Sequence, residues 1–423
     1  MKLRRPAVPL LALALATCAT YTSRMTVPGE HYYEGSYARA EEEVGKLVRG
    51  ASNEDLHLYL LERGKIRLAA GDYDSAIVDL QAAERRFDEI EGTFSVGEAL
   101  QTALASETSV EYQPPAHEKI LISAYLLLAY WLDGDVEGAL VERKRVIGRL
   151  ERYGREYDLD EWKKLDVPFA RYLTALLYEL EGMADDAGIE YRRISRLSPG
   201  AVPGEPLPHL TELAVIAEIG RSPVKVSREV RGWFADRGGG LAGFFDLPGE
   251  GGPIVFPLDP QPFDRSGLGT VFTFAFPQYV RRPRTAVSCR VVVDGVEAGE
   301  AVTLDDIEET AMEAFRRNLG AILMKSALRT YIQLLAQNAL DGDAGRVADA
   351  LAKFFSAVER ADTRSWQTLP AEIAVYRLEV DPGEHEVSVR YFDSAGCLVG
   401  ESGSVEVTVP EGSKQIAYLP AVP

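Results

Sequence analysis

The chain has 423 residues, of which 46% are hydrophobic and 26% charged, and its formal net charge is −19. This length allows two or more domains with sizeable cores, and the composition is that of a globular protein rather than a disordered chain. The negative charge repels phosphates, so nucleic acid and anionic lipid surfaces are excluded as partners bound through a basic surface.

The first 18 residues have the order of an export signal. Lys2, Arg4 and Arg5 precede a short apolar stretch and then small residues, as in a secretory signal peptide. The stretch is too short for a membrane-spanning helix. The end of this segment, Leu-Ala-Thr-Cys18, resembles a bacterial lipobox, which implies cleavage after residue 17 and a diacylated Cys18. The alternative is an ordinary secretory signal.

The mature protein is therefore expected to be exported and held at the cell membrane by its lipid alone. In a diderm host, Ala19 rather than Asp after the cysteine favours the outer membrane, facing the periplasm. Residues 18–30 are interpreted as a tether between this lipid anchor and the folded protein.

Residues 31–218 are predicted to form helical hairpins. Apolar residues recur at helical spacing, and short glycine-containing turns separate the runs. In four turns an alanine follows the glycine by five positions. These pairs are Gly35 with Ala40, Gly71 with Ala76, Gly134 with Ala139, and Gly182 with Ala187.

This pattern resembles the tetratricopeptide repeat (TPR), a helix–turn–helix of 34 residues in which small residues let two helices cross closely. The best match spans Leu60 to Asp88, with Gly64 and Tyr73 in phase, and Pro199 marks the end of the last hairpin. The spacing departs from 34 residues, so insertions near residues 90–116 and 150–166 are expected. The alternative is a generic helical bundle. A last helix is predicted over Leu210–Ile219.

The composition then changes. Residues 219–262 are rich in Gly and Pro and are interpreted as a linker. Residues 263–423 are predicted to form an α+β domain with an antiparallel sheet, in which Asp294-Gly295 and Pro382-Gly383 are turns. The predicted strands are Val271–Phe276, Val287–Val293, Ile373–Val380, Glu386–Phe392 and Val405–Val409.

A pair of helices inserted at about residues 305–361 is expected between these strands. Within it, Leu319–Leu340 is apolar nearly all round and carries Lys325 and Arg329 as its only charges. A membrane-inserting helix and a helix buried against a sheet both fit, and the polar residues favour the buried helix.

Several short runs together resemble an uncharacterised family of bacterial lipoproteins that join a repeat-containing helical half to a β-rich half. The runs are Gly220–Lys225, Ala275–Pro277, Ala361–Pro370 and Gly134-Asp135 with Ala139–Arg143. The resemblance covers most of residues 30–420 and depends mainly on the Asp-Thr-Arg-Ser-Trp segment. It implies an envelope location and this architecture, and it implies no activity.

A search for catalytic or cofactor motifs finds none. The five histidines form no metal-ligand pair, and no phosphate-binding loop or nucleophile elbow is present. No metal and no cofactor is therefore expected. Cys289 and Cys397 lie in strand-like segments, where they form either a disulfide or two buried thiols.

The candidate binding residues are aromatic and cationic. The concave face of the repeats, lined by the first helix of each hairpin, is the candidate surface in the helical half. Arg364 and Trp366 are the candidate site in the β half, although such a pair is more often structural. The helical candidates are Tyr125, Tyr130, Trp131, Tyr172 and Tyr178.

These features predict a non-catalytic adaptor or scaffold that grips a protein or peptide partner in the cell envelope. The alternative is a glycan-binding or hydrolytic protein acting on the cell wall with carboxylates and aromatics of its C-terminal domain.

Overall fold

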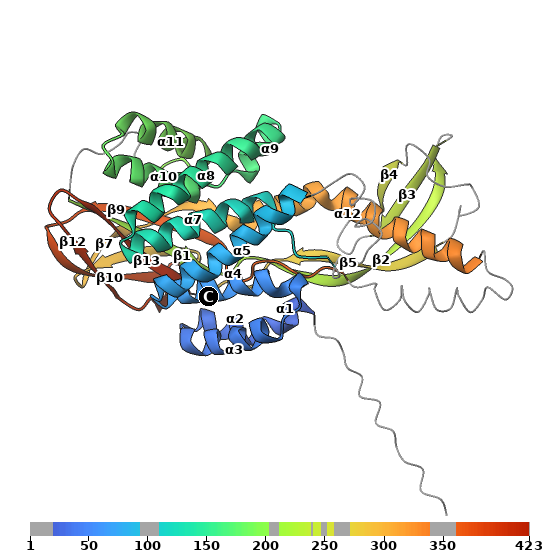
Figure 1. The fold of residues 1–423 in the computed structure, drawn as a ribbon, viewed down its shortest axis with the longest axis horizontal. Coiled ribbons are helices and arrows are strands. Elements are labelled where there is room, and N and C mark those ends of the chain that lie inside the picture. The colour runs from blue at the N-terminus through green and yellow to red at the C-terminus, as the bar shows by residue number, and fades with distance from the viewer. Residues whose placement is uncertain are drawn as a thin grey trace, which may run out of the picture.

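The computed structural model has helices in its N-terminal half and mainly antiparallel sheets in its C-terminal half (Figure 1). The structure describes residues 20–93, 110–202, 211–237, 240–246, 252–257, 271–338 and 361–422.

The helical half consists of antiparallel hairpins, as predicted. Helices α2 and α3, α4 and α5, α7 and α8, and α10 and α11 form the pairs. Their bounds are α1 (Tyr21–Arg24), α2 (Thr26–Tyr33), α3 (Tyr37–Gly50), α4 (Asn53–Ala69), α5 (Tyr73–Thr93), α7 (Ala116–Asp133), α8 (Val136–Glu156), α9 (Leu159–Leu165), α10 (Pro168–Leu180) and α11 (Ala184–Leu197).

The predicted turn glycines end the first helices. All four have positive φ, from 72° at Gly182 to 84° at Gly134, a conformation that glycine adopts without a Cβ penalty. The alanines that follow them by five positions lie on the second helices and are completely buried, so they belong to the packing and not to a surface. These alanines are Ala40, Ala76, Ala139 and Ala187.

The close helix contact expected around Gly64 is present. An added Cβ at Gly64 would lie 2.8 Å from Leu80 Cγ, so α4 and α5 are in direct contact there. Helix α11 ends two residues before Pro199, as predicted. The hairpins are thus located by small residues, while their spacing along the chain stays irregular.

The predicted tether is wrong from Tyr21 onward. Residues 21–33 form α1 and α2 and pack into the core, with Tyr21 5% and Met25 1% exposed. The Tyr21 hydroxyl donates to Glu62 at 2.9 Å, and Thr22 Oγ1 donates to the Lys225 carbonyl at 2.8 Å. Aromatic side chains at Tyr21, Tyr32 and Tyr33 supply the apolar surface that a free tether lacks.

The strands of the described residues form three sheets. Sheet A has the order β13-β1-β9-β8, sheet B the order β4-β3-β2-β5, and sheet C the order β11-β10-β6-β7 with β12 also paired to β10. The strands are β1 (Glu212–Ile219), β2 (Val224–Arg237), β3 (Gly240–Asp246), β4 (Ile254–Pro257), β5 (Val271–Val280), β6 (Ser288–Val293), β7 (Val296–Glu300), β8 (Val302–Asp306), β9 (Glu372–Glu379), β10 (Gly383–Phe392), β11 (Leu398–Glu401), β12 (Val405–Val409) and β13 (Lys414–Val422).

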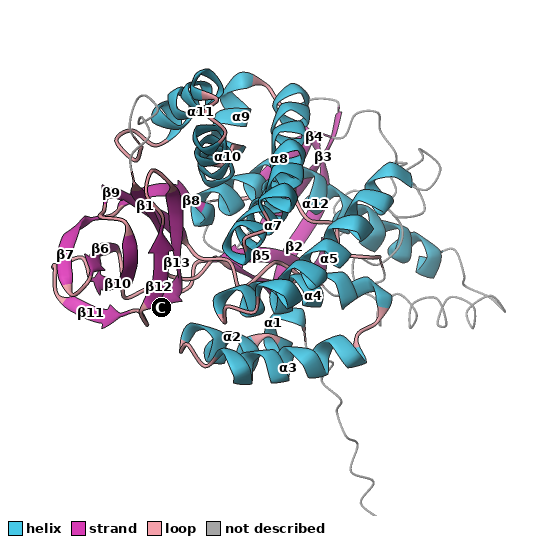
Figure 2. Cartoon of the chain, turned by 60° about the vertical axis from the view of Figure 1, so that its left-hand side comes forward, coloured by secondary structure: helices cyan, strands magenta, loops and turns pink. Residues whose placement is uncertain are grey.

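Sheet A lies between the helices and sheet C (Figure 2). Alternate residues of β1 point to opposite faces of sheet A. Ala214 and Ile216 pack in the core shared with the helices, whereas Leu213 and Val215 pack in the core shared with sheet C. A strand covered on both faces is a continuous apolar run without a period of two. For this reason the helix predicted over Leu210–Ile219 is wrong.

The predicted linker at residues 219–262 is also wrong in its described parts, because β2, β3 and β4 of sheet B lie there. The five predicted strands are confirmed with shifted ends, and Asp294-Gly295 is the β6–β7 turn with both φ values positive. Strands β7, β8, β11 and β13 were not predicted.

Of the pair of helices predicted at about residues 305–361, the described residues contain one long helix, α12 (Ile307–Asn338), and the remainder of the prediction falls on residues 339–360, which lie outside the described part. It follows β8 directly and packs on β5, with the Phe315 ring 5.4 Å from that of Tyr279. Helix α12, β2 and β5 extend away from sheets A and C (Figure 1). Within the described ranges, no helix combines the length and the apolar content that crossing a membrane requires.

Asp305 at the end of β8 joins sheet A to the start of α10. Its buried carboxylate accepts a hydrogen bond from the Phe169 backbone N–H at 3.1 Å. Burial raises the pKa of Asp305 to about 7. The carboxyl group of Asp305 therefore binds a proton more tightly in the folded protein than in the unfolded chain. The free energy of unfolding that the protonated carboxyl group contributes is lost as the pH rises from about 4 to 7.

Asp305→Asn is expected to keep the hydrogen-bond acceptor and to remove this pH dependence. Relative to the variant, the wild type should lose about 1.4 kcal/mol of unfolding free energy per pH unit between pH 4 and 7. Urea unfolding at pH 4.5, 5.5 and 6.5 measures the difference. Asp185→Asn, an exposed position on α11, is the control and should keep the wild-type slope. If the unfolding free energy of the wild type and of Asp305→Asn changed equally with pH, the raised pKa of Asp305 would be contradicted.

Candidate functional site

The predicted aromatic anchors are mostly interior side chains. Tyr125 and Tyr172 are completely buried and Trp131 is 8% exposed. Tyr130 and Tyr178 are half-buried, and the guanidinium of Arg143 lies 4.2 Å from the Tyr178 ring centroid. The face carried by the first helices α4, α7 and α10 is therefore not an open binding surface, because the protein's own sheet A covers it.

A buried ion pair lies at the centre of this contact. The ammonium of Lys65 on α4 is 2.8 and 2.9 Å from the two carboxylate oxygens of Glu218 on β1, and both side chains are completely buried. Lys65 also donates to the hydroxyls of Tyr32 at 3.0 Å and Tyr418 at 2.6 Å. Tyr125 on α7 donates to Glu218 at 2.6 Å. One charge pair thus connects α2, α4, α7, β1 and β13.

The electrostatics of this cluster reflect its removal from water. Burial lowers the pKa of Lys65, and Glu218 partly opposes the effect. Burial raises the pKa of Tyr125 well above its ordinary value, as does the Glu218 charge. A buried pair of this kind tolerates loss of one partner poorly, because the remaining charge has no water to solvate it.

A second polar junction fastens α10 and α11 to the same sheet. Arg377 on β9 binds Glu212 on β1 at 2.5 Å and Glu179 on α10 at 2.8 Å, and it donates to the Tyr191 hydroxyl at 2.6 Å. Lys414 on β13 also contacts Glu179, at 3.2 Å. Burial opposes the charge of Arg377, but these partners outweigh it and raise its pKa.

Arg364 and Trp366 are structural in their contacts. Arg364 is 3% exposed and binds Asp362 at 2.9 Å as well as the Glu54 and Val110 carbonyls. Trp366 is 1% exposed, and its ring packs edge-on against Tyr125. The segment they occupy ties the start of β9 to α4, and neither side chain is presented to a ligand.

The two cysteines do not form the possible disulfide. Cys289 lies buried on β6, whereas Cys397 is exposed in the turn before β11, and both are free thiols. Burial raises the pKa of Cys289 to about 12, so it is inert at neutral pH. The predicted lipidation residue, Cys18, lies outside the described residues.

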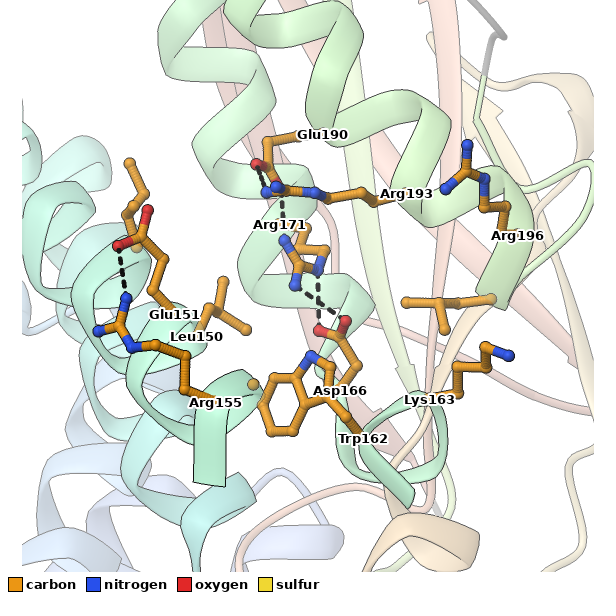
Figure 3. A pocket seen from close by; sticks show the side chains of 13 residues that line it. Leu150, Glu151, Arg155, Trp162, Lys163, Asp166, Arg171, Glu190, Arg193 and Arg196 are labelled. Atoms are coloured by element: carbon orange, nitrogen blue, oxygen red, sulfur yellow. Dashed lines mark hydrogen bonds and ion pairs between the residues drawn. The ribbon is translucent and has the colours of Figure 1, made fainter. Parts of the chain in front are cut away.

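An open cleft of about 810 Å³ lies on the outer side of the helical half, between α8, α9, α10 and α11 (Figure 3). Its floor contains Arg171, which binds Asp166 through two hydrogen bonds of 2.8 and 2.9 Å and Glu190 through one of 2.6 Å. Glu190 in turn binds Arg193 at 2.6 Å. Trp162 forms part of the wall, close to Gly154, where an added Cβ would lie 3.3 Å from its indole nitrogen.

This cleft was not predicted from the sequence. Its lining comes from four helices over residues 147–197, so no short motif contains it. The local signal was the Arg-Arg-Ile-Ser-Arg run ending at Arg196, which places Arg193 and Arg196 three residues apart on one helix face.

The carboxyl groups with raised pKa values do not line this cleft. Burial raises the pKa of Asp305 and of Glu118 to about 7, and burial together with Glu84 raises that of Glu142 to about 8. Each lies in a packing interface between elements. Among the described residues, no group of three His, Cys, Asp or Glu side chains is arranged to hold a metal ion.

Comparisons with known proteins give no relatives: no protein-family model matches the chain, and no curated protein sequence matches it significantly.

Lys65→Met is expected to destabilise the protein by about 3–5 kcal/mol, because it leaves the buried Glu218 charge unpaired. The double variant Lys65→Met/Glu218→Gln should cost clearly less than the sum of the two single variants. Urea unfolding followed by circular dichroism measures all three. Lys46→Met removes a surface lysine that pairs with Glu42 and Glu43, and it should leave the unfolding midpoint unchanged. If the double variant lost as much unfolding free energy as the two single variants together, an energetic coupling between Lys65 and Glu218 would be contradicted.

Proposed function

We propose that this protein is a lipid-anchored, non-catalytic adaptor that binds a protein partner in the bacterial cell envelope. Its hairpin layer is TPR-like in the sense of its turn glycines and buried alanines, whose spacing and conformation support repeat packing. The partner would bind the outward side of that layer, since the inward side contacts sheet A.

The exposed apolar side chains of the hairpins carry this proposal. Large apolar residues that face solvent lie on the second helices α5, α8 and α11 and near the α10–α11 turn, and Val27 on the first helix α2 is exposed as well. Apolar side chains that face solvent are the kind of residue from which protein interaction surfaces are built. The residues are Val78 on α5, Val136 and Val141 on α8, Leu180 at the end of α10, Met183 beside its turn and Ile189 on α11.

The position of α1 supports a rigid form of anchoring. Two residues, Ala19 and Thr20, separate Cys18 from α1, and α1 is docked on α4 through Tyr21 and Glu62. Two extended residues span about 7 Å. A lipid on Cys18 would therefore hold the body of the protein directly at the membrane surface rather than on a long tether.

Cys18→Ala is expected to move the exported protein from the membrane fraction to the soluble fraction, because its acyl chains are lost. Cys397→Ala, which removes the exposed thiol, is the control and should stay with the membrane. Fractionation of cells producing each variant is the measurement. Recovery of Cys18→Ala with the membrane would contradict the lipid anchor.

The outward surface is tested by cross-linking on native membranes. Val141→Lys/Ile189→Lys is expected to abolish capture of a partner that the wild type captures, because two cations would be buried in the interface. Val296→Lys changes a still more exposed valine on sheet C and should capture the same partner. Equal capture by both variants, or none by the wild type, would contradict the adaptor proposal.

A further inference from the structure

We propose that the cleft between α8, α9, α10 and α11 binds a small amphipathic anion, a molecule that joins a carboxylate or phosphate group to an apolar part. This proposal does not depend on the lipid anchor or on the adaptor function, because it concerns a separate recess on the helices.

The charge of the cleft supports an anionic ligand. Five cations line it against three carboxylates, in a chain whose net charge is −19. Arg155 comes from α8, Lys163 from α9, and Arg193 and Arg196 from α11, so cations surround the opening from three helices. Arg196 is exposed, and within the described ranges no carboxylate forms an ion pair with it. An anion in the cleft would be attracted from several sides.

The walls supply the apolar half of the site. Leu150 is 4% and Trp162 8% exposed, and Ile147 and Leu197 are half-buried beside them. The volume of about 810 Å³ lies in the range of small-molecule pockets, which combine an apolar lining with a few placed polar groups. Inorganic phosphate alone would leave the exposed parts of Ile147 and Leu197 in contact with water.

The floor is already organised. The two hydrogen bonds between Arg171 and Asp166 fix the guanidinium plane, and Glu190 links Arg171 to Arg193 (Figure 3). Burial disfavours the Arg171 charge, but Asp166 and Glu190 outweigh it and raise its pKa. The floor beneath the cations at the opening is therefore held in place before a ligand binds. This reduces the conformational entropy that the protein loses on binding.

A smaller recess of about 350 Å³ on α5 and α8 provides the contrast. Its arginines are each opposed by a carboxylate of α5: Arg149 binds Asp88 at 2.8 Å and Arg152 binds Glu91 at 2.7 Å. Those arginine charges are neutralised by ion pairs between α5 and α8. The larger cleft differs in Arg196, which lines it and forms no ion pair with a carboxylate of the described residues.

Isothermal titration calorimetry on the purified protein without its signal segment tests the site with three probes. Decanoate carries both features, decyltrimethylammonium carries the tail with the opposite charge, and inorganic phosphate carries the anion without the tail. We expect one decanoate per protein, weaker binding at higher salt, and no binding of the other two. Equal binding of decanoate and decyltrimethylammonium would overturn the claim that the cleft selects a negative charge. Displacement of decanoate by phosphate would overturn the claim that the apolar walls contribute to binding.

Arg196→Glu is expected to weaken decanoate binding about tenfold, because it reverses a charge at the opening. Arg192→Glu makes the same change at an exposed position of the same helix that does not line the cleft, and it should bind as the wild type does. Thermal melts that match the wild type show that both variants fold. Equal weakening by the two variants would place the anion outside the cleft and overturn the proposal.

Discussion

The buried pair of Lys65 and Glu218 holds the helical hairpins and sheet A together. Taking two charges out of water costs more than their attraction returns unless every remaining hydrogen-bonding position is filled. Here the remaining hydrogen bonds are made by the hydroxyl groups of Tyr32 on α2, Tyr125 on α7 and Tyr418 on β13. The pair is satisfied only when the hairpins and sheet A are assembled in one register, so it favours this assembly over other packings of the same apolar surfaces.

This assembly determines which surfaces remain for function. An open helical solenoid offers its first helices to partners, but here that face is an internal interface with sheet A. The outward helices, their turns and the cleft beside Trp162 remain accessible. On the hairpins, the surface that remains for a partner is therefore the side that faces away from sheet A. Docking of α1 next to Glu62 fixes Tyr21–Arg24 to the same body.

The sequence predicted the features that depend on neighbouring residues. A glycine in the left-handed conformation and an alanine in a tight helix crossing are local requirements, so Gly71 and Ala76 located a hairpin without knowledge of the fold. Strand β1 was not predictable in this way, because its continuous apolar run results from burial between two layers. The burial of Tyr125 was missed for a similar reason: its partner, Glu218, is 93 residues away, and only the assembled sheet brings them together.

The distribution of charge explains why the cleft stands out in so acidic a protein. Inside the molecule, cations are matched locally to carboxylates: Lys65 to Glu218, Arg377 to Glu212 and Arg364 to Asp362. Such matching uses charge for assembly and leaves little field outside. At the cleft the internal pairing of Arg171 is complete, yet further cations from α8, α9 and α11 gather above it. Assembly of the helices accounts for the buried arginine and for the pairs Arg193–Glu190 and Arg155–Glu151, and it gives no reason for Arg196, which has no ion pair among the described residues.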